Sequence, residues 1–232
     1  LPDALALAQT MADIGKLAGK PVVAVITSMA QPLGTHIGNA LEVKDAIDVL
    51  AGRTQGDLLE ISLLLGSHML VLAEKARTLP EARAMLENAL SSGAGLRKLA
   101  EMIAAQGGDP RVVEDLSLLP QAAVKRVMRA ETAGYLSAMD TTALGMAAQR
   151  MGAGRAKKSD MLDYSVGYVL HVRLGDEVTE DTPLATLYAR NEAEAEEAEK
   201  AIRKALTIAR KKPQTPKLWD AVVTAEGITY NR

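Results

Sequence analysis

The first 120 residues place their apolar positions mainly at helical spacing. Apolar residues from Leu5 to Ile14 follow this spacing, which predicts a helix from Asp3, its N-cap, to about Ala18. The wholly apolar run at residues 22–26 predicts a short parallel strand covered on both faces. The same periodicity predicts helices at residues 39–52, 57–76, 80–90 and 96–105. Residues 1–120 are therefore expected to form an α/β domain.

After residue 120 the pattern changes to short alternating runs separated by glycine-containing turns. Strands are predicted at residues 124–127, 134–139, 166–172 and 183–188, with a turn at residues 174–178 that leads into another strand. Helices are predicted at residues 142–151 and 191–212, the second capped by Asn191 and followed by a packed segment around Leu218. Residues 121–232 are therefore expected to form an α+β C-terminal domain around a β-rich module.

Composition excludes several classes of function. The net charge is -2, from 27 Lys and Arg against 29 Asp and Glu, so charge-driven binding to nucleic acid or an anionic membrane is not expected. The chain contains no Cys, which excludes disulfides and thiolate sites and fits a cytoplasmic protein. Its most apolar stretch, residues 58–73, is interrupted by polar residues and is shorter than the roughly 20 apolar residues of a membrane span.

The amino terminus carries neither an initiator Met nor the layout of a signal peptide. Leu1, Pro2 and Asp3 lead directly into the first helical pattern. The sequence is therefore expected to begin within a longer protein.

The loop at residues 27–35 and the helix after it are the strongest candidate for chemistry. Gly34 and Gly38 allow tight turns, and exposed loop carbonyls with a helix-borne carboxylate such as Asp45 could surround a hard cation. The alternative is a tight strand-to-helix turn in which Glu42, Asp45 and Asp48 lie on the solvent side. Spacing alone favours this alternative, because no regular calcium-loop pattern is present.

Two motifs in this region resemble a family signature. The motifs are Gln-Pro-Leu-Gly at residues 31–34 and Gly-Asn-Ala-Leu-Glu-Val at residues 38–43, separated by three residues. The pair is similar to the signature of bacterial pyrimidine-nucleoside and thymidine phosphorylases. The likeness continues in order through residues 65–67, 104–108, 119–123, 145–147, 152–155, 163–167, 174–176 and 183–184.

This resemblance implies phosphorolysis of a pyrimidine nucleoside to a free base and a pentose 1-phosphate. It makes residues 1–120 the end of the phosphorylase α/β domain and residues 121–232 the family's C-terminal domain, in chains that are usually homodimers. The family's Lys-Ser-Thr-Gly phosphate loop and its base-binding Arg, Ser and Lys lie upstream of the position matching Leu1. The chain is therefore expected to lack catalytic and substrate-binding residues and to be inactive without the N-terminal half.

The resemblance also implies a potassium site. Relatives bind the ion through two loop carbonyls, a helix carboxylate and further ligands from the phosphate loop. The matching groups are the carbonyls of Leu33 and His36 and the side chain of Asp45. His36 replaces a small residue. Asp45 stands where Glu is common, so its carboxylate reaches less far and is expected to need a bridging water. The site is expected to be incomplete in this chain.

Other chemistry is less well supported. His36, His68 and His171 show no metal-ligand spacing, and His68 and His171 are interpreted as structural. Residues 175–184 also resemble the hairpins of biotinyl and lipoyl carrier domains, which indicates a barrel-sandwich shape. The Lys pair at residues 157–158 lacks the setting of a modified lysine, which argues against a carrier function. A non-catalytic binding or carrier-like module is therefore kept only as the alternative to the phosphorylase. A third candidate is a related transferase that uses phosphoribosyl pyrophosphate and shares the α/β domain. Such an enzyme lacks the C-terminal β module, so the β-rich stretch at residues 134–187 argues against this candidate.

Overall fold

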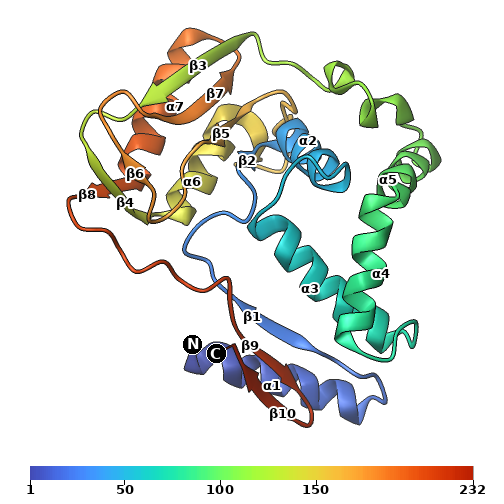
Figure 1. The fold of residues 1–232 in the computed structure, drawn as a ribbon. Coiled ribbons are helices and arrows are strands. Elements are labelled where there is room, and N and C mark those ends of the chain that lie inside the picture. Colours follow the sequence, from blue (N-terminus) through green and yellow to red (C-terminus); the bar gives the residue numbers. More distant parts are fainter. Residues whose placement is uncertain (232) are drawn as a thin grey trace. The chain divides into compact units, whose positions relative to one another are not determined.

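The computed structural model describes residues 1–231, which divide into two compact units (Figure 1). Unit 1 consists of Leu1–Met29, Asp57–Ala89 and Pro216–Arg232, and unit 2 consists of Ala30–Gly56 and Leu90–Thr215. Unit 2 runs across residue 120, so the compact units and the predicted domains divide the chain differently. The domain boundary itself remains a prediction. The fold class is mixed α/β with several antiparallel sheets.

Unit 1 combines helices with a three-stranded sheet. Its helices are α1 (Pro2–Leu17), α3 (Asp57–Leu72) and most of α4 (Leu79–Ser91). Its strands are β1 (Ala24–Thr27), β9 (Trp219–Thr224) and β10 (Gly227–Tyr230), in the order β1-β9-β10. The segment expected to pack around Leu218 is thus the start of a hairpin.

Strand β1 corrects one expectation. It was expected to be parallel and covered on both faces, but it pairs antiparallel with β9, with Ala24 opposite Val223 and Ile26 opposite Ala221. All of its residues are only half-buried. An apolar run indicates burial without specifying the direction of the partner strand, and this partner comes from the other end of the chain.

Helix α1 lies along the sheet of unit 1 (Figure 1). The helix itself was predicted, but its N-cap is Leu1, and Asp3 lies in the first turn, where the helix dipole favours a carboxylate. The helix turns its small residues Ala8, Ala12 and Gly15 inward. The backbone approaches closely there, because a Cβ atom on Gly15 would lie 2.4 Å from a methyl group of Val22.

Unit 2 contains several helices and two sheets, and these two sheets include all the remaining strands of residues 1–231. The strands are β2 (His36–Ile37), β3 (Val124–Arg129), β4 (Gly134–Met139), β5 (Gly167–Leu170), β6 (Glu177–Val178), β7 (Pro183–Ala189) and β8 (Leu206–Ala209). The α-helices are α2 (Asn39–Leu50), α5 (Ala94–Ala105), α6 (Thr141–Ala148) and α7 (Glu192–Ala205). The short helical turns are η1 (Pro110–Val113), η2 (Leu116–Leu118) and the π-helical η3 (Gln149–Ala153).

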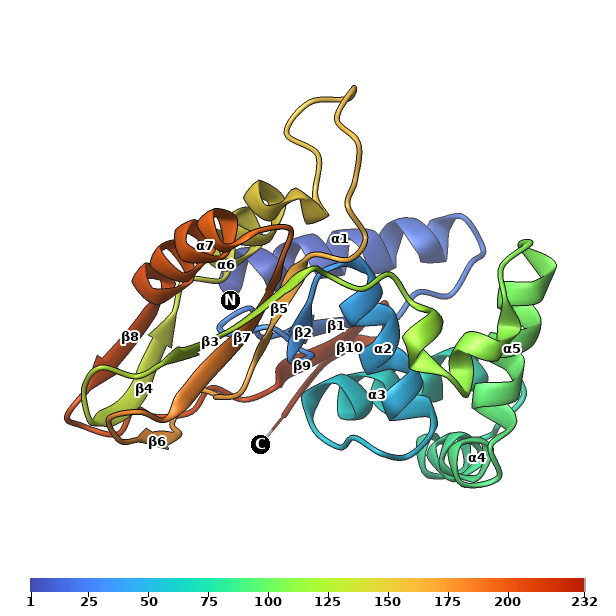
Figure 2. The same cartoon turned by 90° about the horizontal axis from the view of Figure 1, so that it is seen from above.

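The strand orders of unit 2 are β2-β5-β7-β3 and β6-β4-β8, and every pairing is antiparallel. Helices α6 and α7 pack together on one side of these strands (Figure 2). The main core lies between them and the sheets, and its largest fully buried side chains are Met128, Leu136, Leu144, Tyr168, Leu170, Leu184, Leu187 and Ile202. Tyr168 donates its hydroxyl hydrogen to the carbonyl of Leu144 at 2.8 Å, so the core contains no unpaired phenol.

The helix predicted from residue 191 to residue 212 ends earlier. Helix α7 stops at Ala205, and residues 206–209 form β8, which pairs with β4. Leu206, which lies within the predicted helix, is instead opposite Met139 in the sheet. Thr207 and Ile208 are β-branched, and the exposed edge of β4 offers them hydrogen bonds that a helix end cannot.

Among residues 1–231, no helix is long and apolar enough to cross a membrane.

Candidate functional site

The candidate loop enters unit 2 at Ala30 and leads through β2 into α2. Gly38 is the N-cap of α2 and has a φ of 136°, a conformation that other residues rarely adopt. A Cβ atom there would lie 2.4 Å from the carbonyl oxygen of Val166. Gly38 therefore allows the start of α2 to pack directly on the backbone that precedes β5.

Asp45 is the buried carboxylate of this region. Spacing alone placed it on the solvent side of α2, but it is only 4% exposed. The backbone N–H of Thr35 donates to Asp45 Oδ2 at 3.2 Å, and Nδ1 of His36 lies 3.4 Å from Asp45 Oδ1. The loop thus folds back over α2, which sequence periodicity could not show. Two of the three predicted ligand residues, His36 and Asp45, are brought together.

The carbonyl of His36 lies on the open side of β2. The neighbouring carbonyl of Thr35 accepts a hydrogen bond from the backbone N–H of Leu170 at 2.8 Å, on the β5 side. Successive carbonyls in a strand point to opposite sides, and the carbonyl of His36 is therefore directed away from β5. Since β2 is an outer strand of its sheet, this oxygen is not used in a ladder among the described residues.

The carbonyls on either side of Leu33 are held by a side chain that sequence analysis missed. Nη1 of Arg173 donates to the carbonyl of Pro32 at 2.6 Å and lies 3.5 Å from that of Gly34. The backbone N–H of Leu174 donates to the side-chain oxygen of Gln31 at 2.9 Å. Arg173 is 141 positions from Pro32, and no local pattern indicates such a contact.

A chain of polar contacts continues from Asp45 along α2. Lys44 Nζ lies 3.4 Å from His36 Nε2 and 3.3 Å from Asp48, whose other oxygen accepts from Arg53 at 2.7 Å. Burial lowers the pKa of His36, and the charge of Lys44 lowers it further against the opposing effect of Asp45. Burial would raise the pKa of Asp48, but the hydrogen bonds from Arg53 and Lys44 outweigh it and the pKa is lowered. At neutral pH the imidazole is therefore uncharged beside ionised Asp48.

The donor set fits a hard cation in type but not in number. A carboxylate and carbonyl oxygens are the ligands that such cations take, usually six or more in all. Leu33, His36 and Asp45 supply three groups, and Asp45 is already engaged by Thr35 and His36. No cluster of three or more His, Cys, Asp or Glu side chains suited to a metal occurs within residues 1–231. Any ion bound here would depend on carbonyls and on ligands from elsewhere.

Of the other two histidines, which were both interpreted as satisfied structural residues, His171 has a hydrogen-bond partner within the described part of the chain and His68 does not. Nε2 of His171 is 2.7 Å from the hydroxyl of Thr186, which fits its interpretation as a satisfied histidine. Nε2 of His68 in α3 is buried and has no partner among residues 1–231, and burial lowers the pKa of His68. Neither imidazole contacts a nucleophile and an acid together in the manner of a catalytic triad.

Comparison with known proteins connects this site to a family. Residues 2–96 match the model of the glycosyl transferase family a/b domain, and residues 135–209 match that of the pyrimidine nucleoside phosphorylase C-terminal domain. The two matches lie on either side of residue 120.

Among curated proteins, the chain is similar to pyrimidine-nucleoside phosphorylases along most of its length. Identity is 49% over 192 residues with that of Geobacillus stearothermophilus, covering 83% of this chain and 44% of the relative. It is 49% over 190 residues with that of Bacillus subtilis (strain 168), covering 82% and 44%. It is 44% over 209 residues with that of Staphylococcus aureus (strain USA300), covering 90% and 48%. The chain thus spans about half the length of the relatives that it matches, and it belongs to the pyrimidine-nucleoside phosphorylase family, of which it carries the C-terminal portion.

Proposed function

We propose that this chain contributes the C-terminal part of an enzyme that converts a pyrimidine nucleoside and phosphate into the free base and a pentose 1-phosphate. The observation that carries the proposal is the likeness to enzymes named pyrimidine-nucleoside phosphorylase, at 49% identity over 83% of the chain. In this reaction a phosphate oxygen bonds to C1′ of the pentose while the bond to the base breaks and its electron pair leaves with the base. Groups that neutralise the charge on phosphate and base would lower the barrier.

The chain by itself is proposed to be inactive. The groups expected to hold phosphate and base, a Lys-Ser-Thr-Gly loop and an Arg, Ser and Lys set, belong to the part of the enzyme upstream of Leu1 in the resemblance. Near the family motif, unit 2 offers the buried carboxylate of Asp45 and the loop carbonyls, which are oxygen groups of the kind that bind a hard cation. The proposed role of this part is positioning.

The proposed ligand of this site is a potassium ion. Asp45 would supply a carboxylate oxygen, and His36 and Leu33 would supply carbonyl oxygens. Arg173 supports this geometry by holding the carbonyls of Pro32 and Gly34. The carbonyl of Leu33, which lies between them, would then point away from Arg173 and toward the ion. The missing ligands would come from the phosphate loop, and a bound ion would order that loop in the intact enzyme.

Three further features belong to the same proposal. The intact enzyme is proposed to be a cytoplasmic homodimer, on the strength of the family resemblance. The C-terminal module is proposed to have a barrel-sandwich shape. Its support is the pair of antiparallel sheets in unit 2 that share the core under α6 and α7.

A direct assay tests the proposal. Release of uracil from uridine in the presence of phosphate is measured for the chain alone and for the chain joined behind the N-terminal part of the Geobacillus stearothermophilus enzyme. We expect no turnover by the chain alone and phosphate-dependent turnover by the joined protein. Turnover by the chain alone would refute its proposed inactivity, and a folded but inactive joined protein would refute the proposed activity.

The cation is tested separately in the joined protein. Asp45→Asn removes the carboxylate charge while keeping the side-chain volume, so we expect potassium to stimulate turnover much less in this variant. Asp48→Asn, one turn further along α2, is the matched control because Asp48 binds Arg53 and Lys44 and is no proposed ligand. Calorimetry should detect at most weak potassium binding to the chain alone, and tight, saturable binding would contradict the incomplete site.

A further inference from the structure

Helix α1 presents its large apolar side chains outward and its small ones inward. Ala8, Ala12 and Gly15 face the sheet of unit 1. The outward residues are Leu7, Met11, Ile14 and Leu17, which are 63%, 54%, 60% and 89% exposed. A helix at the surface of a folded protein normally buries its large apolar side chains and exposes polar ones. The arrangement in α1 is that of a helix with a second layer on its outer side.

This orientation is fixed by packing. A Cβ atom on Gly15 would lie 2.4 Å from a methyl group of Val22 and 2.7 Å from the carbonyl oxygen of Lys20. Rotation of the helix to bury Ile14 would bring a branched side chain to a place where no Cβ atom fits. The outward stripe therefore cannot be removed by a small movement within unit 1.

The sheet under α1 is also incomplete on one side. Strand β1 pairs with β9 and has no partner on its other edge within residues 1–231. Its sequence is Ala-Val-Ile-Thr, without the charged residues or proline that usually protect an exposed edge. One register shift, between Ile26 and Thr27, is the irregularity in its pairing with β9. Unit 1 thus leaves an apolar helix face exposed and the backbone groups on one edge of β1 without a strand partner among the described residues.

We infer that this outer surface, formed by Leu7, Met11, Ile14, Leu17 and the open edge of β1, is the docking site for the half of a phosphorylase chain that this chain does not span. We call it the α1 face. The inference rests on the proposed function in taking the chain as part of such an enzyme. The occupant would add a strand beside β1 and place apolar side chains on α1.

The length of the relatives supports this occupant. They are matched over only 44% to 48% of their length, so more than half of each polypeptide lies outside the match. A covalently linked neighbour acts at a high effective concentration and can cover the α1 face without a bimolecular step. A second copy of this chain is the weaker candidate, because β1 has only four residues and would offer few hydrogen bonds to another β1.

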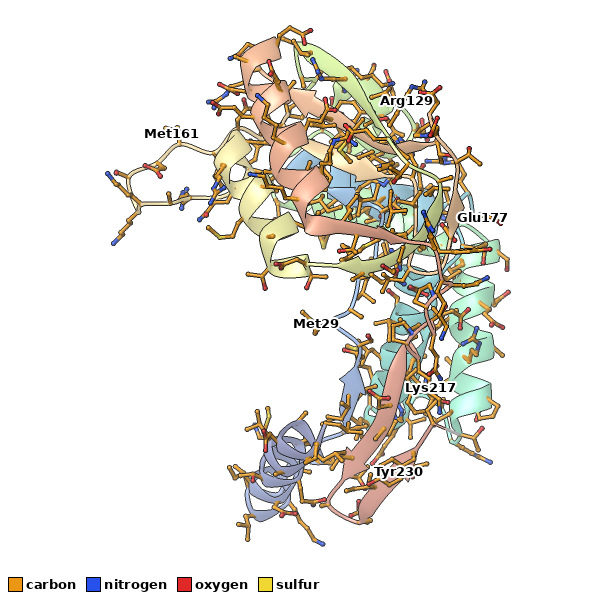
Figure 3. The ribbon with its side chains drawn as sticks, turned by 90° about the vertical axis from the view of Figure 1, so that its left-hand side faces the viewer. Met29, Arg129, Met161, Glu177, Lys217 and Tyr230 are labelled. Atoms are coloured by element: carbon orange, nitrogen blue, oxygen red, sulfur yellow. The ribbon has the colours of Figure 1, made fainter. Side chains whose placement is uncertain are left out.

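Methionine oxidation provides a test with internal controls. Met11 lies on the α1 face, and Met128 is fully buried. Met161 is 91% exposed in the loop that projects from unit 2 (Figure 3). Dilute hydrogen peroxide is added, and the rate of sulfoxide formation at each position is followed by mass spectrometry. The chain alone is compared with the chain joined behind the N-terminal part of the Geobacillus stearothermophilus enzyme.

We expect Met11 and Met161 to react at similar rates in the chain alone. In the joined protein we expect at least a tenfold slower reaction of Met11 and no change at Met161, with Met128 unreactive in both as the sign of a folded core. Equal reactivity of Met11 in the two proteins, with Met128 protected, would overturn the inference. Protection of Met11 in the chain alone would also overturn it. If Met11 were protected in the chain alone and lost this protection on dilution, a second copy of the chain would cover the α1 face. If the protection did not depend on concentration, another part of the same chain would cover it.

A variant separates docking from activity. When the two parts are produced as separate polypeptides, Leu7→Glu should weaken their association at least tenfold, whereas Met161→Glu, an equally exposed apolar position outside the α1 face, should not. Equal association of both variants would overturn the inference. Uridine phosphorolysis is measured on the same joined protein. Protected Met11 without turnover would refute the proposed function alone, and turnover with reactive Met11 would refute the inference alone.

Discussion

The guanidinium of Arg173 donates a hydrogen bond to the carbonyl oxygen of Pro32 at 2.6 Å. Arg173 follows β5 in the sequence of the C-terminal module, whereas Pro32 lies in the first family motif. The contact therefore ties the candidate cation loop to the region matched by the phosphorylase C-terminal domain.

Removal of this contact should loosen the loop. Arg173→Met keeps most of the apolar stem but leaves the Pro32 carbonyl without its donor, so we expect a loss of about 1–2 kcal/mol in the free energy of unfolding. Hydrogen exchange at residues 31–36 should become faster, and Arg173→Lys should restore part of the protection. Arg190→Met, which breaks an exposed pair with Glu194, is the control and should cost less than about 1 kcal/mol. Unchanged exchange in the loop would contradict the proposed clamp.

Gly167 should tolerate no side chain. Its φ is 149°, and a Cβ atom would lie 2.1 Å from the carbonyl oxygen of Ile37. Gly167→Ala must separate β5 from the start of α2 or strain the backbone, so we expect a destabilisation of about 2–4 kcal/mol in chemical unfolding. Gly145→Ala is the matched change, because Gly145 lies in α6 with no atom within 4 Å of a new Cβ. That variant should be neutral or stabilised by roughly 0.5–1 kcal/mol, and similar losses for both would show that the close approach is not decisive.

Tyr168 should contribute stability that is lost at high pH. Its hydroxyl is bonded to the Leu144 carbonyl, and burial raises its pKa above the ordinary value. A group with a raised pKa in the folded state stabilises the protein below its unfolded pKa, about 10 for tyrosine, and loses that contribution as the pH rises further. Tyr168→Phe should cost about 1–2 kcal/mol at pH 7. The difference between the two proteins should shrink above pH 10, and a difference that grew there would contradict the assigned burial.

Glu199 should give a matching effect in acid. Burial would raise its pKa, but hydrogen bonds from Arg203 and Arg126 outweigh this and lower it. The pairs with Arg126 and Arg203 therefore stabilise the protein above the unfolded pKa of about 4.3 and are lost as the pH falls through the lower folded value. Glu199→Gln should destabilise the protein by about 1 kcal/mol at pH 7 and have little effect near pH 3. Thermal unfolding across this range is the measurement, and a pH-independent effect would indicate lost packing instead.

The sequence predicted most elements whose ends are set locally. Asn191 was expected to cap a helix, and its side chain does accept the backbone N–H of Glu194 at 2.9 Å. Gly152, with a φ of 106°, interrupts the helical conformation within η3, inside the stretch 152–154 where the helix was expected to stop. Such signals lie within a few residues of the feature that they specify.

Distant contacts were not predictable in the same way. The antiparallel partner of β1, the burial of Asp45 beneath Thr35 and the bond from Arg173 all join positions whose proximity only the completed fold decides. The three residues of the candidate cation site were named from family resemblance, and periodicity alone placed Asp45 on the wrong side of α2. Whether the three groups bind potassium remains a prediction.

The pairing of β1 with β9 also governs the order in which the protein can be completed during synthesis. Val25 lies opposite Val222, so β1 has no strand partner until residues 219–224 have been synthesised. The two segments of unit 2, Ala30–Gly56 and Leu90–Thr215, can emerge and pack meanwhile, because neither extends beyond Thr215. A ribosome that stops before residue 219 would therefore release a chain with an assembled unit 2 and an unpaired, apolar β1.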